Sequence, residues 1–176
     1  MPRLQLYLDH VDTRLALRYL EPNGGVSEIP CLRLITYANL FAQLVHSPLA
    51  ADYGICRCFI DTGAFISIIP ETIWQFLRPG VVTPLPFDPT TPPNQRQLII
   101  AGGTFPFELG RLTLKLEDRS RATLNLSIVA KLTRDGGRLP FPLTLGLRGG
   151  FLEGRTLQAV PDATAPFGQA WTLTEL

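Results

Sequence analysis

The sequence predicts an all-β fold for this chain of 176 residues, and three patterns lead to it. Apolar and polar residues alternate over residues 112–116 and again over residues 124–128, with a polar segment between them, which is typical of a half-buried hairpin. Two apolar runs flank residues 61–64, as expected where two strands meet at a loop. Residues 4–8 alternate in the same way as the hairpin. A chain of this length is expected to hold one domain of ordinary size.

The first 52 residues are expected to form an N-terminal extension that packs on the main domain. Alternation over residues 4–8 and again over residues 15–19 predicts a hairpin. Residues 37–46 instead carry apolar side chains at helical spacing, which predicts a helix. The sequence leaves two roles open for this extension, an added layer on the core or a dimerisation arm.

Asp61 is the most informative residue of the chain, because a carboxylate stands between two apolar runs. Burial of an acid costs free energy unless hydrogen bonds or a partner charge stabilise it, so such an acid often belongs to a functional site. Gly63 allows the backbone to approach the carboxylate closely, and Thr62 offers a hydroxyl that can hold the loop. The alternative is a tight turn between two strands, where Asp and Gly are common.

The segments after this loop have weaker patterns. Residues 70–77 predict a short helix with Pro70 in its first turn. Six prolines in residues 79–93 predict an irregular surface loop that serves as a connector. Residues 151–157 are consistent with a second short helix, and alternation over residues 171–174 predicts a final strand.

The loop Asp61-Thr62-Gly63-Ala64, with its apolar flanks, resembles the active-site loop of retropepsin-like aspartic proteases. Three further stretches follow in the order seen in that family: a flap hairpin at residues 98–105, a long hairpin at residues 112–128 and an apolar-glycine-arginine element at residues 143–148. In this chain the flap tip corresponds to Ala101, Gly102 and Gly103, and the late element to Leu145, Gly146 and Arg148.

The resemblance covers about residues 53–155. It implies a retropepsin-like acid protease barrel over residues 53–176, with a flap hairpin and one or two short helices. Two departures concern the support of the site. Phe65 stands where the family usually has Ser or Asp, and Leu147 separates the late glycine from its arginine. Neither departure changes Asp61.

The resemblance also implies an assembly and a mechanism. The Asp-Thr-Gly triplet occurs once, so a site with two carboxylates needs a second copy of the chain, and a homodimer with a twofold axis provides it. Two neighbouring carboxylates share one proton, as in the aspartic protease pair used as a standard example of this effect. A water molecule activated between the two Asp61 side chains would then hydrolyse a polypeptide substrate, with no metal and no cofactor.

Two other interpretations remain beside the endopeptidase. A descendant of the same fold could bind an extended peptide without cutting it, or it could serve as a purely structural dimer. Cleavage of an unstructured protein that is lost on Asp61→Asn would distinguish the enzyme from both.

Composition sets further expectations. Lys and Arg total 16 against 15 Asp and Glu, and the arginines are scattered, which argues against nucleic acid as a partner. No apolar run reaches the length of a membrane span, and the first residues do not read as a signal peptide. Three cysteines favour a reducing compartment, so a cytoplasmic location is expected. Cys56 and Cys58 share one face of a strand and are expected to act as small apolar side chains. Neither histidine has partners at zinc-ligand spacing.

Overall fold

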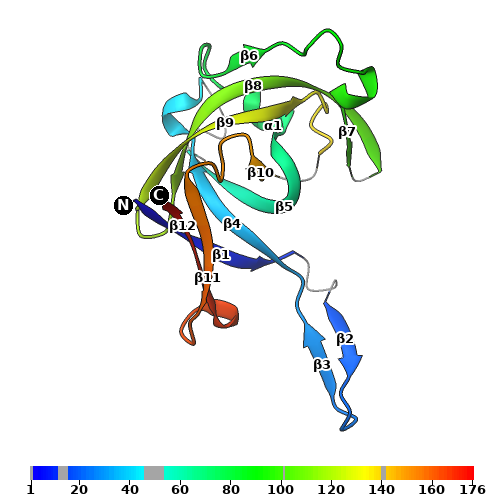
Figure 1. The fold of residues 1–176 in the computed structure, drawn as a ribbon, viewed down its shortest axis with the longest axis vertical. Helices are drawn as coiled ribbons and strands as arrows, with labels where there is room; N and C mark the ends of the chain where they lie inside the picture. Colours follow the sequence, from blue (N-terminus) through cyan, green and yellow to red (C-terminus); the bar gives the residue numbers. More distant parts are fainter. Residues whose placement is uncertain (1, 12–15, 46–53, 101, 140–141) are drawn as a thin grey trace.

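The structure is a computed structural model, and it describes residues 2–11, 16–45, 54–100, 102–139 and 142–176. The chain is predominantly β, as the sequence predicts (Figure 1). Its strands are β1 (Arg3–His10), β2 (Leu17–Leu20), β3 (Val26–Ile29), β4 (Leu32–Asn39), β5 (Ile55–Ile69), β6 (Thr83–Leu85), β7 (Gln97–Ile100), β8 (Gly103–Glu117), β9 (Thr123–Thr133), β10 (Thr144–Arg148), β11 (Arg155–Pro161) and β12 (Gln169–Glu175). The helices are α1 (Glu71–Trp74) and three 3₁₀ turns, Phe41–Gln43, Pro93–Arg96 and Pro166–Gly168.

Ten of these strands form one sheet, in the order β10-β5-β9-β8-β4-β1-β12-β11, with β6 and β7 also paired to β8. Strand β4 pairs with both β8 and β5, so the hydrogen-bonded path from β5 through β9, β8 and β4 returns to β5. Strands from both sides of residue 53 therefore belong to the same sheet. All four strands of this closed path, together with β1 and β12, contribute side chains to the main hydrophobic core.

The hairpin of β8 and β9 supplies much of that core. Leu112 pairs with Ile128 and Leu114 with Leu126, and these side chains are almost fully buried. The alternation in the sequence therefore predicted both the strands and the face that they bury. A second apolar cluster lies where β7 pairs with the start of β8, and its buried members are Ile68, Leu98, Phe105, Phe107 and Leu139.

Both predictions for the N-terminal segment need correction. Within the described residues β1 does not pair with β2; it lies between β4 and β12, while β2 pairs with β3. The reason is burial, because β1 hides Leu4 and Leu6 in the core whereas β2 is exposed along its length. In the described part of the predicted helix over residues 37–46, only a single 3₁₀ turn, Phe41–Gln43, is present, and the start of the segment is strand. Strand β4 continues to Asn39, because pairing with β5 and β8 outweighs the local apolar spacing.

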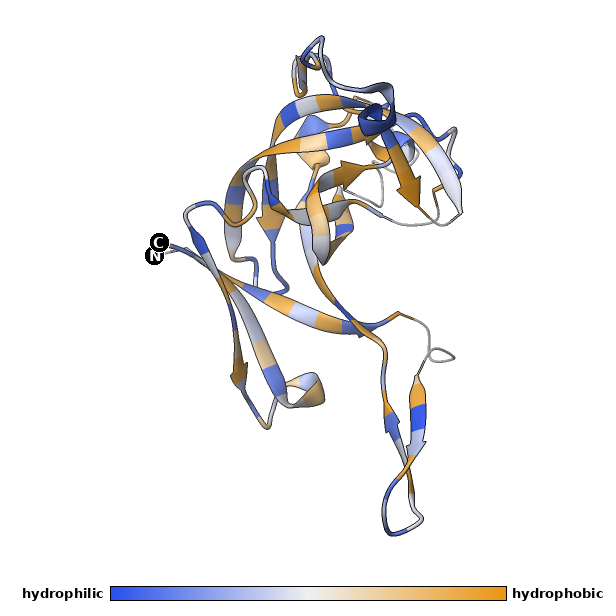
Figure 2. Cartoon of the chain, turned by 45° about the vertical axis from the view of Figure 1, so that its right-hand side comes forward, coloured by the Kyte–Doolittle hydropathy of each residue, from blue (hydrophilic) through white to orange (hydrophobic). Residues whose placement is uncertain are grey.

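The hairpin of β2 and β3 projects from the rest of the molecule, as Figures 1 and 2 show. Apolar residues occupy positions on both strands and are largely exposed, including Leu17, Leu20 and Val26. It is the part of the predicted N-terminal extension that lies furthest from the core.

The later segments agree with the sequence only in part. Helix α1 begins directly after Pro70 but is a single turn. The proline-rich span 79–93 contains the short strand β6 and otherwise forms turns and irregular chain. The predicted helix at residues 151–157 is wrong: turns lead into β11 there, and the carboxylate of Glu153 accepts hydrogen bonds from two preceding glycine N–H groups. The predicted final strand is confirmed as β12.

Asp118 joins β1 to the turn between β8 and β9. Its carboxylate accepts hydrogen bonds from the N–H groups of Gln5, Ser120 and Ala122 and from the Ser120 hydroxyl. Burial alone would raise the pKa of Asp118, but these hydrogen bonds outweigh burial and hold the pKa below its usual value. The ionised acid thus stabilises the fold.

We expect Asp118→Asn to destabilise the chain by about 1–3 kcal/mol at neutral pH, because an amide cannot accept all four bonds. Because the folded pKa lies below the unfolded value of about 3.9, the contribution is complete above that value and falls as pH drops through the folded pKa. Urea unfolding between pH 7 and pH 2 should show a smaller acid loss of stability in the variant than in wild type. Equal acid profiles would contradict this role.

None of the helices in the described part of the chain is long and apolar enough to cross a membrane.

Candidate active site

Strand β5 bends at Asp61, and β10 lies between the two halves of the bent strand. Gly146 of β10 pairs in parallel with Asp61, and Leu145 pairs with Ile60 on the same half. Arg148 pairs with Ile66, which lies on the other half of β5. The loop at residues 61–64 and the late glycine element, which are far apart in sequence, therefore meet at one place.

Gly146 is required at this crossing because the backbone of β5 lies directly against it. A Cβ atom at residue 146 would lie 2.4 Å from the carbonyl carbon of Ile66 and 2.6 Å from its oxygen. The N–H of Gly146 also donates a hydrogen bond to the buried Ser67 hydroxyl at 3.3 Å. Leu145 beside it is fully buried in the core, whereas Arg148 is exposed at the end of β10.

The Asp61 carboxylate is exposed in the single chain, together with Thr62 and Gly63, while Ala64 is half-buried. Its Oδ1 accepts a hydrogen bond from the Gly63 N–H at 2.8 Å. The position of Asp61 between two apolar runs therefore does not bury its carboxylate in the single chain. The backbone approach that Gly63 permits is as expected: a Cβ there would lie 3.3 Å from Asp61 Oδ1.

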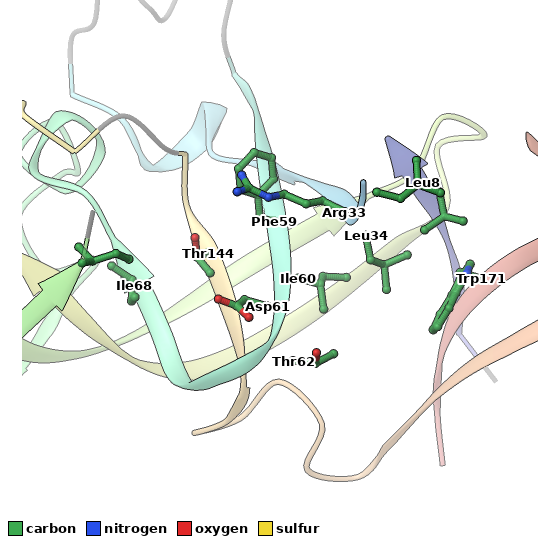
Figure 3. Close-up of a pocket in the computed structure, with 12 residues that line it drawn as sticks. Leu8, Arg33, Leu34, Phe59, Ile60, Asp61, Thr62, Ile68, Thr144 and Trp171 are labelled. Atoms are coloured by element: carbon green, nitrogen blue, oxygen red, sulfur yellow. The ribbon is translucent and has the colours of Figure 1, made fainter. Parts of the chain in front are cut away.

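The Asp61 side chain lines a cavity of about 730 Å³. Among the lining residues Asp61 is the only carboxylate, and most of the others are apolar (Figure 3). They come from β1, β4, β5, β7, β10 and β12, and are Leu8, Leu32, Arg33, Leu34, Phe59, Ile60, Asp61, Thr62, Ile68, Ile100, Thr144 and Trp171. The dimensions suit several residues of an extended peptide rather than a single small group.

The hairpin of β7 and β8 brings the predicted flap to this cavity. Ile100 pairs with Gly103 across the turn and also lines the cavity. Gly102 is exposed at the turn with a φ of 77°, a left-handed conformation that favours glycine. Ala101, the third residue of the predicted tip, lies outside the described residues.

Sequence reasoning missed several residues of the cavity wall. Arg33 reaches it through the pairing of β4 with β5, and no local pattern in the sequence marks it. Thr144 also lines the cavity and lies within the predicted element at residues 143–148. Trp171, the first residue of the alternation that predicted the final strand, is half-buried against the core and also lines the cavity.

Within the described residues, little supports a catalytic cysteine, a catalytic histidine or a metal site. Cys58 is fully buried in the core and burial raises the pKa of its thiol, while Cys56 packs against the same core, as predicted. His10 stacks edge-on against Phe167 at 5.2 Å between ring centres. Across the described ranges, no three His, Cys, Asp or Glu side chains lie close enough to hold a metal ion.

Comparisons with models of protein families, with curated proteins and with solved structures find no match to this chain.

Proposed function

We propose that this chain is a homodimeric aspartic endopeptidase of the retropepsin-like type. The observation that carries the proposal is the placement of Asp61. It lies on a bent strand that closes around Gly146, at the edge of a peptide-sized cavity to which the β7–β8 hairpin contributes Ile100. The Asp61 loop, the late glycine element and the flap hairpin were each expected from the resemblance.

The strand arrangement supports the finer assignment to a retropepsin-like barrel. The path from β5 through β9, β8 and β4 back to β5 makes a small closed core, and the Asp61 loop emerges from it. The β7–β8 hairpin, which contributes Ile100 to the cavity wall, suits a flap that closes on an extended peptide and excludes water. Main-chain hydrogen bonds to that peptide would provide affinity, and pockets for alternate side chains would provide selectivity.

A single chain provides one of the two carboxylates that this mechanism needs. No other lining residue of the cavity is a carboxylate, and Asp61 is exposed, so a second copy can approach it. Two Asp61 carboxylates about 3 Å apart would share one proton, since both cannot ionise without strong repulsion. The ionised acid takes a proton from a water that attacks the peptide carbonyl, and the protonated acid hydrogen-bonds the carbonyl oxygen and later helps to protonate the leaving amine. The pair titrates as a unit.

Subunit mixing tests this shared site directly. Wild type should cleave an unstructured protein, and a ninefold excess of Asp61→Asn chain should reduce the activity of a fixed amount of wild type to roughly a tenth, because about nine in ten wild-type chains then have an inactive partner. Substrate is kept in large molar excess, and subunit exchange is followed by energy transfer between labelled chains. Unchanged activity after complete exchange would mean that each chain holds its own site, and the proposal would fail.

One observation favours the alternative of a peptide-binding module without catalysis. Phe65, at the position where the family usually has a polar residue, is 73% exposed and so cannot brace the loop in the isolated chain. Peptide binding by wild type without cleavage at any pH would favour this module over the enzyme.

The cytoplasm is the proposed location. The cysteines of the structure, Cys31, Cys56 and Cys58, are free thiols, which suits a reducing compartment.

A further inference from the structure

Arg33 lies next to Asp61 in the sheet. In the pairing of β4 with β5, Leu34 stands opposite Ile60, and Arg33 and Asp61 are the next residues along the two strands. Side chains alternate along a strand, so Asp61 and Phe59 share one face of β5. Figure 3 shows Arg33 and Asp61 beside the same cavity, which both residues line.

The guanidinium of Arg33 is held by an aromatic ring. Its central carbon lies 4.7 Å from the centre of the Phe59 ring, within the range of a cation–π interaction. Stacking limits the rotamers of a long side chain and leaves the edge N–H groups of the planar guanidinium available for hydrogen bonds. The group is therefore oriented before any ligand arrives.

A second arginine on the same ring has a different environment. The Arg57 guanidinium lies 5.5 Å from the Phe59 ring centre, forms an ion pair with Asp9, and does not line the Asp61 cavity. Asp9 stands opposite Arg33 in the pairing of β1 with β4, yet its carboxylate contacts Arg57. Over the ranges that the structure describes, no carboxylate lies within ion-pair distance of Arg33.

The chemistry of the cavity indicates what such a group would bind. Arg33 is the only basic residue among the lining residues, and its neighbours are mostly apolar. A guanidinium fork matches a carboxylate in a bidentate geometry, and partial exclusion of water strengthens the pair.

We infer that Arg33 binds the carboxylate of an acidic side chain in the peptide substrate, close to the bond that is cut. The inference rests on the proposed function for the peptide nature of the ligand. In the twofold assembly each subunit contributes one Arg33, so acidic residues are selected at two positions, one on each side of the scissile bond.

Peptide binding by the full chain carrying Asp61→Asn provides the test, because a ligand can then be measured without cleavage. The probes are labelled, C-terminally amidated eight-residue peptides with one Glu placed at each position in turn, and the same peptides with Gln. Anisotropy titrations should show about tenfold tighter binding for Glu at the selected positions, the effect of one charge-assisted hydrogen-bonded contact. A free-acid version of the Gln peptides shows whether a terminal carboxylate satisfies the same site.

Variants at residue 33 should remove or invert the preference. Arg33→Gln should bind Glu and Gln peptides equally, and Arg33→Glu should prefer Lys at the same positions. The matched control is Arg57→Gln, which removes the other cation from the same ring and should keep the Glu preference.

Two results would overturn the inference. The first is that the Asp61→Asn chain binds Glu and Gln peptides equally, or binds neither. The second is that the preference for Glu persists when Arg33→Gln is added. Cleavage of the same peptides by the wild-type chain tests the role of Arg33 separately from the proposed endopeptidase function. Equal cleavage of Glu and Gln peptides would contradict the proposed role of Arg33 but support the endopeptidase. Selective binding of Glu peptides without cleavage would support the role of Arg33 but contradict the endopeptidase.

Discussion

Replacing Asp61 with asparagine should abolish cleavage of an unstructured protein, with a fall in kcat of about 10⁴-fold or more. An amide at residue 61 can neither take a proton from water nor share one with its twin. The fold should be unaffected, because Asp61 is exposed and the Asn oxygen can still accept the hydrogen bond from the Gly63 N–H. Cleavage rates measured by gel or fluorescence, together with thermal unfolding, provide the comparison.

Asp88 offers a matched control for this substitution. Its Oδ1 accepts a hydrogen bond from the N–H two residues ahead at 2.8 Å, the same local geometry as at Asp61. It lies in the proline-rich connector and does not line the cavity. Asp88→Asn should therefore keep full activity. Residual cleavage by Asp61→Asn at the level of Asp88→Asn would exclude residue 61 as the catalytic acid.

Gly146→Ala should cause the largest loss of stability among the substitutions considered. The added Cβ would lie 2.4 Å from the backbone of Ile66, and backbone cannot rotate away as a side chain can. Either β10 or the second half of β5 must move, at a cost of about 3 kcal/mol, which corresponds to a fall in Tm of about 10 °C for a chain of this size. Scanning calorimetry measures the change directly. Because the same displacement moves Asp61, activity should fall at temperatures where the variant is still folded.

Gly154→Ala separates this clash from the general effect of losing a glycine. Gly154 has a φ of 72° but nothing within 4 Å of an added Cβ, so its substitution reports backbone strain alone. We expect about 1–2 kcal/mol there. If Gly146→Ala were the milder change, the close contact between β10 and β5 would not be the constraint that we describe.

Local patterns predicted the elements that bury one face of a strand. Alternation identified the β8–β9 hairpin because its inward residues are almost fully buried and its outward residues are not. The Asp61 loop and the late glycine element were found because each combines an apolar strand with a glycine, and at Gly146 the close backbone of β5 requires that glycine. These features are short in sequence, so they can be recognised without knowing which strands pair with them.

Pairing between distant segments was beyond the reach of those patterns. The apolar spacing within residues 37–46 predicted a helix, but residues 37–39 pair with β5 and β8 as the end of β4. Strand β1 finds its neighbour β12 at the opposite end of the chain. Arg33 was missed for the same reason, since its place beside Asp61 follows from strand register and not from any neighbour in sequence.

The insertion of β10 between the halves of β5 also has a consequence for the order of folding. Asp61 and its loop are synthesised long before residues 144–148. The loop therefore cannot take its final shape until that distant segment has been made. Contacts of such long sequence separation are slow to form. We therefore expect the amide protons of β5 around residue 61 to gain protection in pulsed hydrogen exchange later than those of the β8–β9 hairpin. The Asp61 loop would therefore reach its final shape only after residues 144–148 had been synthesised and had paired with β5.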